Sequence, residues 1–436
     1  MKLKNIIGLI PAMMLGLSSC NYLDIVPTGA VIPETVTEFR GILANGYYTI
    51  PRNKTLLTVR SDEMDMNRSS SSYLDIARWN DGSPDPYVTQ FPWMDFYKTI
   101  FYANTVIHQG ADATPDGSEP REQLWGEAYL LRAYMHFDLV NMYGTPYNAA
   151  TAATDKGIPL NLITDIEQVF RRASVEKVYQ QIEADIEKGL NLMVVERQEE
   201  GLNKRRFSKS SGYLLKARVA LYKKEYDKAL EAAKTVMTFA GLTNLNESKI
   251  SPIDMTSTEN LMATEKVLSR DLRDNKYFTP TEKVMGLYDQ ENDMRMGFFF
   301  NGNALKKGAT DLEFASFRTA EAYLIAAEAA AYLNKTTEAA QYLATLADNR
   351  LKPEAAEAKK TTLGAMNQEQ LITEIANERL RELIGENHRW FDLRRTTQEE
   401  LTKTVNKVVV TLPAGDPRYT LRIPQSAIEA NPELKD

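Results

Sequence analysis

Apolar side chains recur with the spacing of an α-helix over several long stretches of the chain. From residue 93 onward, one mostly apolar face is formed by side chains at helical spacing: Trp93, Tyr97, Ile100, Asn104 and His108. A second stripe runs through residues 121–143, and Gly144 with Pro146 ends it. A third predicted helix has Ser174 as its N-cap and continues to Met193. The pattern therefore predicts a mainly α-helical protein.

An internal repeat lies further along the chain. Residues 213–236 and 323–346 share the pattern Tyr-x3-Ala-x11-Ala, offset by 110 residues. Small residues at this spacing let two antiparallel helices approach closely across a short turn, predicted at Lys224–Tyr226 and Asn334–Thr336. The pattern resembles the helical hairpin of tetratricopeptide repeats. A third copy is predicted to start at Tyr129, with its second helix displaced to residues 174–193 by an inserted loop.

Two irregular stretches, residues 51–92 and 241–312, interrupt the helical pattern. Both are rich in loop-forming residues, yet both contain many aromatic side chains. Long loops inside a compact domain are usually functional or disordered, and the aromatic content argues against solvated linkers. We therefore predict tetratricopeptide-like helical hairpins packed against an irregular, loop-rich half that carries the ligand face. A few short strands are expected, including Val408–Leu412 paired with Thr420–Ile423 around the turn at Pro413–Pro417.

Three glutamates follow each other at four-residue spacing near the end of the chain. On a solvated helix Glu374, Glu378 and Glu382 would repel one another. Several arginines lie close by in sequence: Arg379, Arg381, Arg389, Arg394 and Arg395. A surface ion network is one interpretation; we predict a partly buried network that holds the last helix in place.

The start of the chain has the pattern of a bacterial lipoprotein signal. Lys2 and Lys4 precede an apolar run, and small residues lead directly to Cys20, the only cysteine. The run is shorter than the ~20 residues that a membrane-spanning helix needs. An ordinary secretory signal with an incidental cysteine is the alternative. We predict that residues 1–19 are a signal peptide, that Cys20 is lipidated, and that residues 20–436 form one membrane-tethered domain.

Composition excludes several classes of function. The net charge is −7, so the sequence gives no electrostatic support for nucleic-acid binding. The three histidines, His108, His136 and His388, are too far apart for a histidine-based metal site. No catalytic motif is present, and the adjacent Asp62 and Glu63 give no support for the opposed carboxyl groups of a glycosidase. We expect a binding protein with no cofactor, and nothing in the sequence indicates calcium.

A candidate carbohydrate site lies in the aromatic loops. A flat aromatic ring can cover the apolar face of a sugar, while amides, carboxylates and guanidinium groups pair with its hydroxyls. One four-residue segment supplies all of these groups: Arg78, Trp79, Asn80 and Asp81. The other candidates are aromatic: Tyr73, Trp93, Tyr277 and Phe278. The alternatives are that Trp79 is a core residue beside a turn, that Trp93 packs at a helix start, and that Asn104 satisfies nearby loop backbone.

Segments spread over the whole mature chain resemble the SusD/RagB family of outer-membrane lipoproteins. They include Cys20-Asn-Tyr-Leu-Asp-Ile-Val-Pro27, Trp93-x3-Tyr97-x2-Ile100-x3-Asn104, Glu127-Ala-Tyr-Leu-Leu-Arg-Ala-Tyr134 and Phe317-Arg318-x2-Glu321-Ala-Tyr-Leu-x2-Ala-Ala-Glu-Ala329. The most specific are Glu378-Arg-x-Arg-Glu-Leu383 and His388-Arg-Trp-Phe-Asp-Leu-Arg-Arg395. The chain is short for that family, which leaves the class of ligand open.

The resemblance implies a cell-surface, lipid-anchored lipoprotein of the outer membrane that breaks no bond. Such a protein captures an oligosaccharide and closes as a lid over a SusC-like TonB-dependent transporter. The same role with peptide cargo is one alternative, and the modest number of tryptophans favours it. A lipid-anchored scaffold whose helical repeats bind only protein is the other.

Overall fold

The computed structural model describes residues 33–51, 54–67, 71–82, 91–165, 167–198, 201–267 and 277–435. Cys20, the predicted signal peptide and the segment after Cys20 therefore lie outside the described residues. Among the residues described, no helix is both long enough and apolar enough to cross a membrane.

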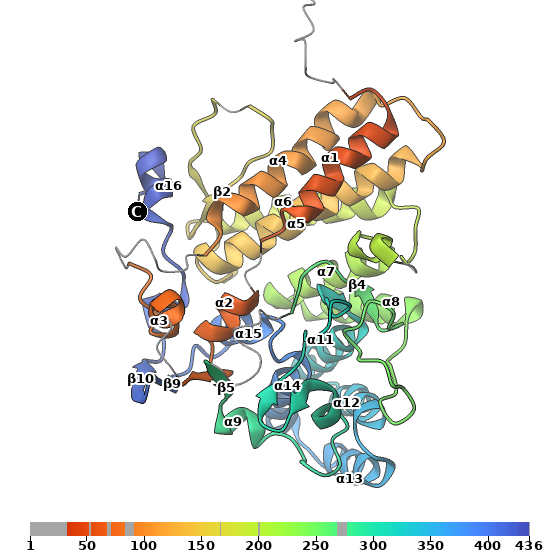
Figure 1. Cartoon of the computed structure of the whole chain (residues 1–436), viewed down its shortest axis with the longest axis vertical. Coiled ribbons are helices and arrows are strands. Elements are labelled where there is room, and N and C mark those ends of the chain that lie inside the picture. The colour runs from red at the N-terminus through yellow and green to blue at the C-terminus, as the bar shows by residue number, and fades with distance from the viewer. Residues whose placement is uncertain are drawn as a thin grey trace, which may run out of the picture. The chain divides into compact units, whose positions relative to one another are not determined.

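Four long helices pack together in the first half of the chain (Figure 1). They are α1 (Val36–Tyr48), α4 (Trp93–Gln109), α5 (Arg121–Tyr143) and α6 (Val175–Leu192). Helix α5 is buried along almost its whole length, because α1, α4 and α6 all pack against it. The Ser174 hydroxyl accepts a hydrogen bond from the Lys177 amide and caps α6 as predicted.

Two helical hairpins follow, where the repeat predicts them. The first consists of α7 (Lys209–Tyr222) and α8 (Tyr226–Phe239), and the second of α11 (Thr319–Tyr332) and α12 (Thr336–Arg350). The repeat alanines Ala217, Ala229, Ala327 and Ala339 are all fully buried. Each turn has one residue with a left-handed backbone, Lys224 at φ 62° and Asn334 at φ 59°. Helix α8 packs on α11, so the hairpins stack on each other.

Helices α5 and α6 approach each other closely at two glycines, Gly126 and Gly189. A Cβ on Gly126 would lie 2.9 Å from the Gly189 carbonyl oxygen and 3.1 Å from the backbone nitrogen of Met193. Because these are backbone atoms, they cannot move aside as a flexible side chain would. The close crossing of the two helices therefore requires a residue without a side chain at this position.

Gly126→Ala is expected to destabilise the fold by about 1–3 kcal/mol, because overpacking outweighs the better helix propensity of alanine. Gly41→Ala in α1 is the matched control, since a Cβ there meets no atom within 4 Å. The control should stabilise the protein by roughly 0.5–1 kcal/mol. Urea unfolding midpoints of the two variants test this, and midpoints that rise together would contradict it.

The loop-rich half is organised by a small sheet of order β10-β9-β1-β5. Its strands are β1 (Met64–Met66), β5 (Phe278–Pro280), β9 (Leu401–Val405) and β10 (Val408–Leu412). Short helices α2 (Lys54–Arg60) and α3 (Ser71–Ala77) lie next to it in sequence. Strand β1 pairs with β5 antiparallel and with β9 parallel, so three distant parts of the chain meet here.

The predicted pairing of Val408–Leu412 with Thr420–Ile423 is wrong. Strand β10 instead pairs antiparallel with β9 across the turn at Asn406 and Lys407. Both turn residues have positive φ, 51° and 65°, as a tight two-residue hairpin of type I′ requires. Residues 420–423 form no strand, and the Leu421 amide donates to the Met142 carbonyl of α5 instead.

The remaining elements connect these groups. The short strands are β2 (Lys156–Pro159), β3 (Arg172–Ser174), β4 (Asn260–Met262), β6 (Phe300–Asn301), β7 (Ala304–Leu305) and β8 (Phe317–Arg318). The other α-helices are α9 (Glu282–Met285), α10 (Arg295–Phe299), α13 (Pro353–Gly364), α14 (Gln368–Leu383), α15 (His388–Arg395) and α16 (Gln425–Ala430). The described 3-10 turns are Gly110–Asp112, Gly201–Arg205, Pro417–Tyr419 and Pro432–Leu434.

The predicted partly buried ion network is confirmed, and Glu382 of α14 lies at its centre. Its carboxylate pairs with Arg295 at 3.0 Å, Arg318 at 2.9 Å and Arg350 at 2.9 Å, all buried. Burial alone would raise the pKa of Glu382, but the three guanidinium groups outweigh it and hold the pKa well below its usual range. The network joins the second hairpin, α14 and the loop-rich half.

Candidate ligand-binding surfaces

Trp79 lies in the core, which corrects its prediction as a ligand-binding residue. The side chain is 1% exposed, and its indole N–H donates to the Arg60 carbonyl at 2.8 Å. The Lys403 ammonium lies 4.8 Å from the ring centroid. Burial lowers the pKa of Lys403 to about 7, and the Arg60 charge adds to this effect. Trp79 has a left-handed backbone, φ 56°, at the end of α3, and this conformation turns its ring inward.

The neighbours of Trp79 form a turn that is fixed to α2. Asp81 accepts two hydrogen bonds from the buried Arg60 guanidinium, at 2.6 and 2.9 Å. Asn80 is exposed, and its amide donates to Asp75 at 3.1 Å. Arg78 is half-buried. Of the predicted segment, Asn80 and part of Arg78 reach solvent, while Asp81 serves mainly to hold the turn.

Asp62 and Glu63 both have structural roles. Asp62 accepts hydrogen bonds from Arg389 at 2.7 and 2.8 Å and from Lys283 at 2.9 Å. Glu63 is fully buried and accepts hydrogen bonds from the Gly385 amide and the Ser61 hydroxyl, both at 2.8 Å. Burial raises the pKa of Glu63 to about 7. Each carboxylate is engaged by its neighbours, so this pair does not form an opposed acid and nucleophile.

Two of the predicted aromatic residues, Tyr73 and Phe278, meet beside the β1–β5 pair, and Tyr277 directly precedes Phe278 in the chain. Tyr73 meets Phe278 edge to face, with ring centroids 5.7 Å apart and an interplanar angle of 83°. Phe278 is buried, which corrects its prediction as a ligand-binding residue, whereas Tyr73 and Tyr277 are half-buried. We call the residues around this contact that reach solvent, Asn67, Tyr73, Tyr277 and Thr279, the tyrosine surface.

Hydrogen bonds between β1 and β5 fix the tyrosine surface. The Asn67 amide N–H donates to the Tyr277 carbonyl at 2.7 Å, and the Asn67 side chain donates to Thr279 at 3.2 Å. Asn67 and Thr279 are polar groups that the sequence analysis did not single out. Their partners are 210 or more positions away, and the residue spacing contains no signal of that pairing.

Trp93 lies at the start of α4 and lines a hollow. Its ring packs edge to face against Tyr143 at 4.8 Å and is tilted on Tyr97 at 5.2 Å. The side chain is 8% exposed, so its main contacts are with the core. Asn104, on the same helix, donates to the carbonyls of Asn161 and Ile163, both at 3.2 Å, which confirms its predicted role toward loop backbone.

The hollow that Trp93 lines is a groove of about 860 Å³ between the start of α4 and α16. Its walls come from residues 91–98, the end of β2, Phe170, and the C-terminal residues 424–434. We call it the α4–α16 groove. Phe91 at its edge packs against both hydrophobic clusters, the one containing Trp93 and the one bordered by Tyr73 and Tyr277.

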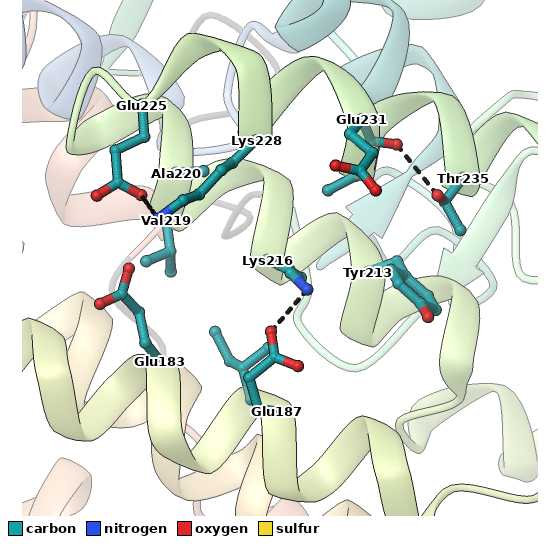
Figure 2. A pocket seen from close by; sticks show the side chains of 12 residues that line it. Glu183, Glu187, Tyr213, Lys216, Val219, Ala220, Glu225, Lys228, Glu231 and Thr235 are labelled. Carbon is teal, nitrogen blue, oxygen red and sulfur yellow. Dashed lines mark hydrogen bonds and ion pairs between the residues drawn. The ribbon is translucent and has the colours of Figure 1, made fainter.

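A smaller cavity of about 340 Å³ lies between α6, α7 and α8 (Figure 2). Two ion pairs lie in its wall, Lys216 with Glu187 at 2.6 Å and Lys228 with Glu225 at 2.8 Å. Glu183 of the lining pairs with Lys223 at 2.7 Å, and Glu231 adds a further carboxylate, so the wall is acidic. Within the described ranges, no group of three or more acidic, histidine or cysteine side chains is arranged to hold a metal ion.

The fold thus combines stacked helical hairpins with a loop-rich half built around a small sheet. Two family models match the chain: "Starch-binding associating with outer membrane" over residues 21–221, and "SusD family" over residues 293–436. The chain belongs to the SusD/RagB family. The two matches lie on either side of residues 222–292, which include part of the loop-rich half.

Solved structures share the fold over nearly the whole chain. A SusD superfamily protein from Bacteroides fragilis is 21% identical, with a TM-score of 0.79 over 92% of this chain and 99% of that one. A "Laminarin binding SusD-like protein" is 19% identical, with a TM-score of 0.64 over 91% of this chain and 98% of that one. The mainly α fold that the sequence predicts is confirmed.

One curated relative has a detectable sequence match to part of the chain. SusD-like protein P38 from Formosa agariphila is 31% identical over 164 residues. This match covers 36% of the chain and only 27% of the relative.

Proposed function

We propose that this protein is a cell-surface lipoprotein, anchored to the outer membrane through Cys20, that captures oligosaccharides without cleaving them. It delivers them to a SusC-like TonB-dependent transporter and acts as the lid of that transporter. Family membership supports carbohydrate binding and association with the outer membrane. The observation that carries the proposal within this chain is the tyrosine surface, where predicted ligand residues from two distant segments meet.

The tyrosine surface has the chemistry that a neutral sugar needs. Half-buried rings of Tyr73 and Tyr277 offer apolar area, and each phenol carries a polar end. Asn67 and Thr279 supply an amide and a hydroxyl beside them, groups that both donate and accept hydrogen bonds. The edge-to-face packing on the buried Phe278 fixes the Tyr73 ring, which lowers the entropy lost when a ligand binds.

Tyr73→Ala and Tyr277→Ala are each expected to weaken oligosaccharide binding about tenfold or more, because each removes apolar contact area and a phenol. Isothermal calorimetry with a panel of oligosaccharides and peptides measures the effect. Tyr48→Ala is the matched control, since Tyr48 is 80% exposed at the end of α1 and takes no part in the tyrosine surface. Equal losses in all three variants would contradict the placement of the site.

The same panel separates the alternatives. Saturable binding of peptides alone would replace oligosaccharide with peptide as the cargo. Binding of neither class, together with capture of a barrel transporter on the purified protein, would favour the protein-binding scaffold.

A further inference from the structure

The α4–α16 groove has the size and lining of a ligand site. Its volume of about 860 Å³ falls within the ~300–1,000 Å³ typical of small-molecule sites. The wall is mostly apolar and includes four aromatic side chains at its base and edge: Phe91, Trp93, Tyr97 and Phe170. Met94, at the rim, is 80% exposed.

Two side chains hold the aromatic wall in place. The Tyr97 hydroxyl donates to the Pro159 carbonyl at 3.1 Å, which joins α4 to the end of β2. The Asn431 amide donates to the Phe170 carbonyl at 2.7 Å, which joins the C-terminal segment to the opposite wall. These two hydrogen bonds connect the elements that line the groove, so the groove has a defined shape before a ligand binds.

The polar groups of the groove suit a neutral ligand with hydroxyls. Asp95 and Lys98 lie one turn apart on α4, both exposed, and neither forms an ion pair with another described residue. They are the charged side chains of the lining, and their charges cancel. A carboxylate accepts hydrogen bonds and an ammonium donates them, so together they match hydroxyl groups, which do both. A strongly charged ligand would gain no net attraction here.

Phe91 links this groove to the tyrosine surface, because it packs against the hydrophobic clusters beneath both. We infer that the α4–α16 groove is a second carbohydrate-binding site, which holds further units of the neutral oligosaccharide bound at the tyrosine surface. The inference rests on the proposed function. It predicts that the groove binds neutral oligosaccharide and that the affinity of the protein rises with the length of the oligosaccharide.

A residue that fills the groove tests the inference. Ala430 lies in the groove wall at the end of α16 and is exposed, so Ala430→Trp adds bulk without disturbing the core. Glu429→Trp is the matched control, since Glu429 is exposed on the same short helix but does not line the groove. Asp95→Ala is a second variant, and it removes a hydrogen-bond acceptor without adding volume.

The probes are laminarin oligosaccharides of increasing length, titrated into the purified full chain by calorimetry. We expect affinity to rise with length in the unmodified protein, and Ala430→Trp to abolish that rise, lowering affinity for the longest probe about tenfold. Glu429→Trp should leave it unchanged. If Ala430→Trp binds every length normally while Tyr73→Ala does not, the inference fails and the proposed function stands. If no oligosaccharide of this series or of the wider panel binds, both fail. If only an apolar peptide enters the groove, the inference is also overturned.

Discussion

Glu382→Gln is expected to lower the free energy of unfolding by about 3–5 kcal/mol, the usual cost of removing one partner from a buried ion pair. The substitution keeps the shape of the side chain but leaves Arg295, Arg318 and Arg350 with one negative charge fewer between them. None of the three guanidinium groups can reach water without moving the surrounding elements, since all three are at most 2% exposed. Urea unfolding followed by circular dichroism measures the loss.

Glu433→Gln is the control for that experiment. Glu433 pairs with Arg171 at 3.0 Å, but their side chains are 47% and 76% exposed. An exposed pair of this kind contributes about 0–1 kcal/mol, because water screens both charges. If the two variants unfolded at the same urea concentration, the buried network would not be the stabilising feature that its geometry indicates.

Trp79→Ala is expected to destabilise the protein by about 3–5 kcal/mol, as large-to-small substitutions of buried aromatic residues do. It removes the ring under the Lys403 ammonium and the hydrogen bond to the Arg60 carbonyl. It also leaves a cavity between α2, the end of α3 and β9. The readout is the urea midpoint, with binding measured separately at a temperature where the variant is folded.

The matched comparison is Tyr73→Ala, since Tyr73 lies on α3, which ends two residues before Trp79, but is only half-buried. Trp79→Ala should lose stability and, once folded, retain most of its affinity for oligosaccharide. Tyr73→Ala should do the reverse. Full stability of Trp79→Ala combined with a complete loss of binding would restore Trp79 as a ligand residue and overturn the role that its burial indicates.

Local patterns were sufficient to predict the helical part of the fold. The apolar stripe of residues 121–143 and the N-cap at Ser174 depend only on neighbouring positions, and both predicted the observed helices closely. The hairpins were predictable because small residues must recur wherever two helices touch. Glu382 belonged to a predicted network, although its partner Arg318, 64 positions away, could not be identified from spacing.

The arrangement of the loop-rich half could not be predicted in this way. Trp79 is buried by Arg60 and Lys403, which are distant in sequence, and only the folded chain brings them around the ring. The pairing of β10 with β9 depends on a left-handed Lys407, a residue type that gives little signal of that conformation. Likewise, the groove beside Trp93 is formed partly by α16 and Phe170. Both lie outside residues 51–92 and 241–312, the two stretches that were predicted to carry the ligand face.

The ion pairs of the loop-rich half also constrain the order in which the protein can fold. Asp62 is paired with Arg389, 327 positions later, and Arg60 donates to the carbonyl of Arg418, 358 positions later. Contacts between such distant positions close very long loops and are associated with slow folding. Because the chain is synthesised from its N-terminus, the helices around α5 can form early. In contrast, α2, α3 and β1 can complete their contacts only after the last fifty residues have been synthesised. The tyrosine surface, which lies beside β1, is thus among the later parts of the protein to be completed.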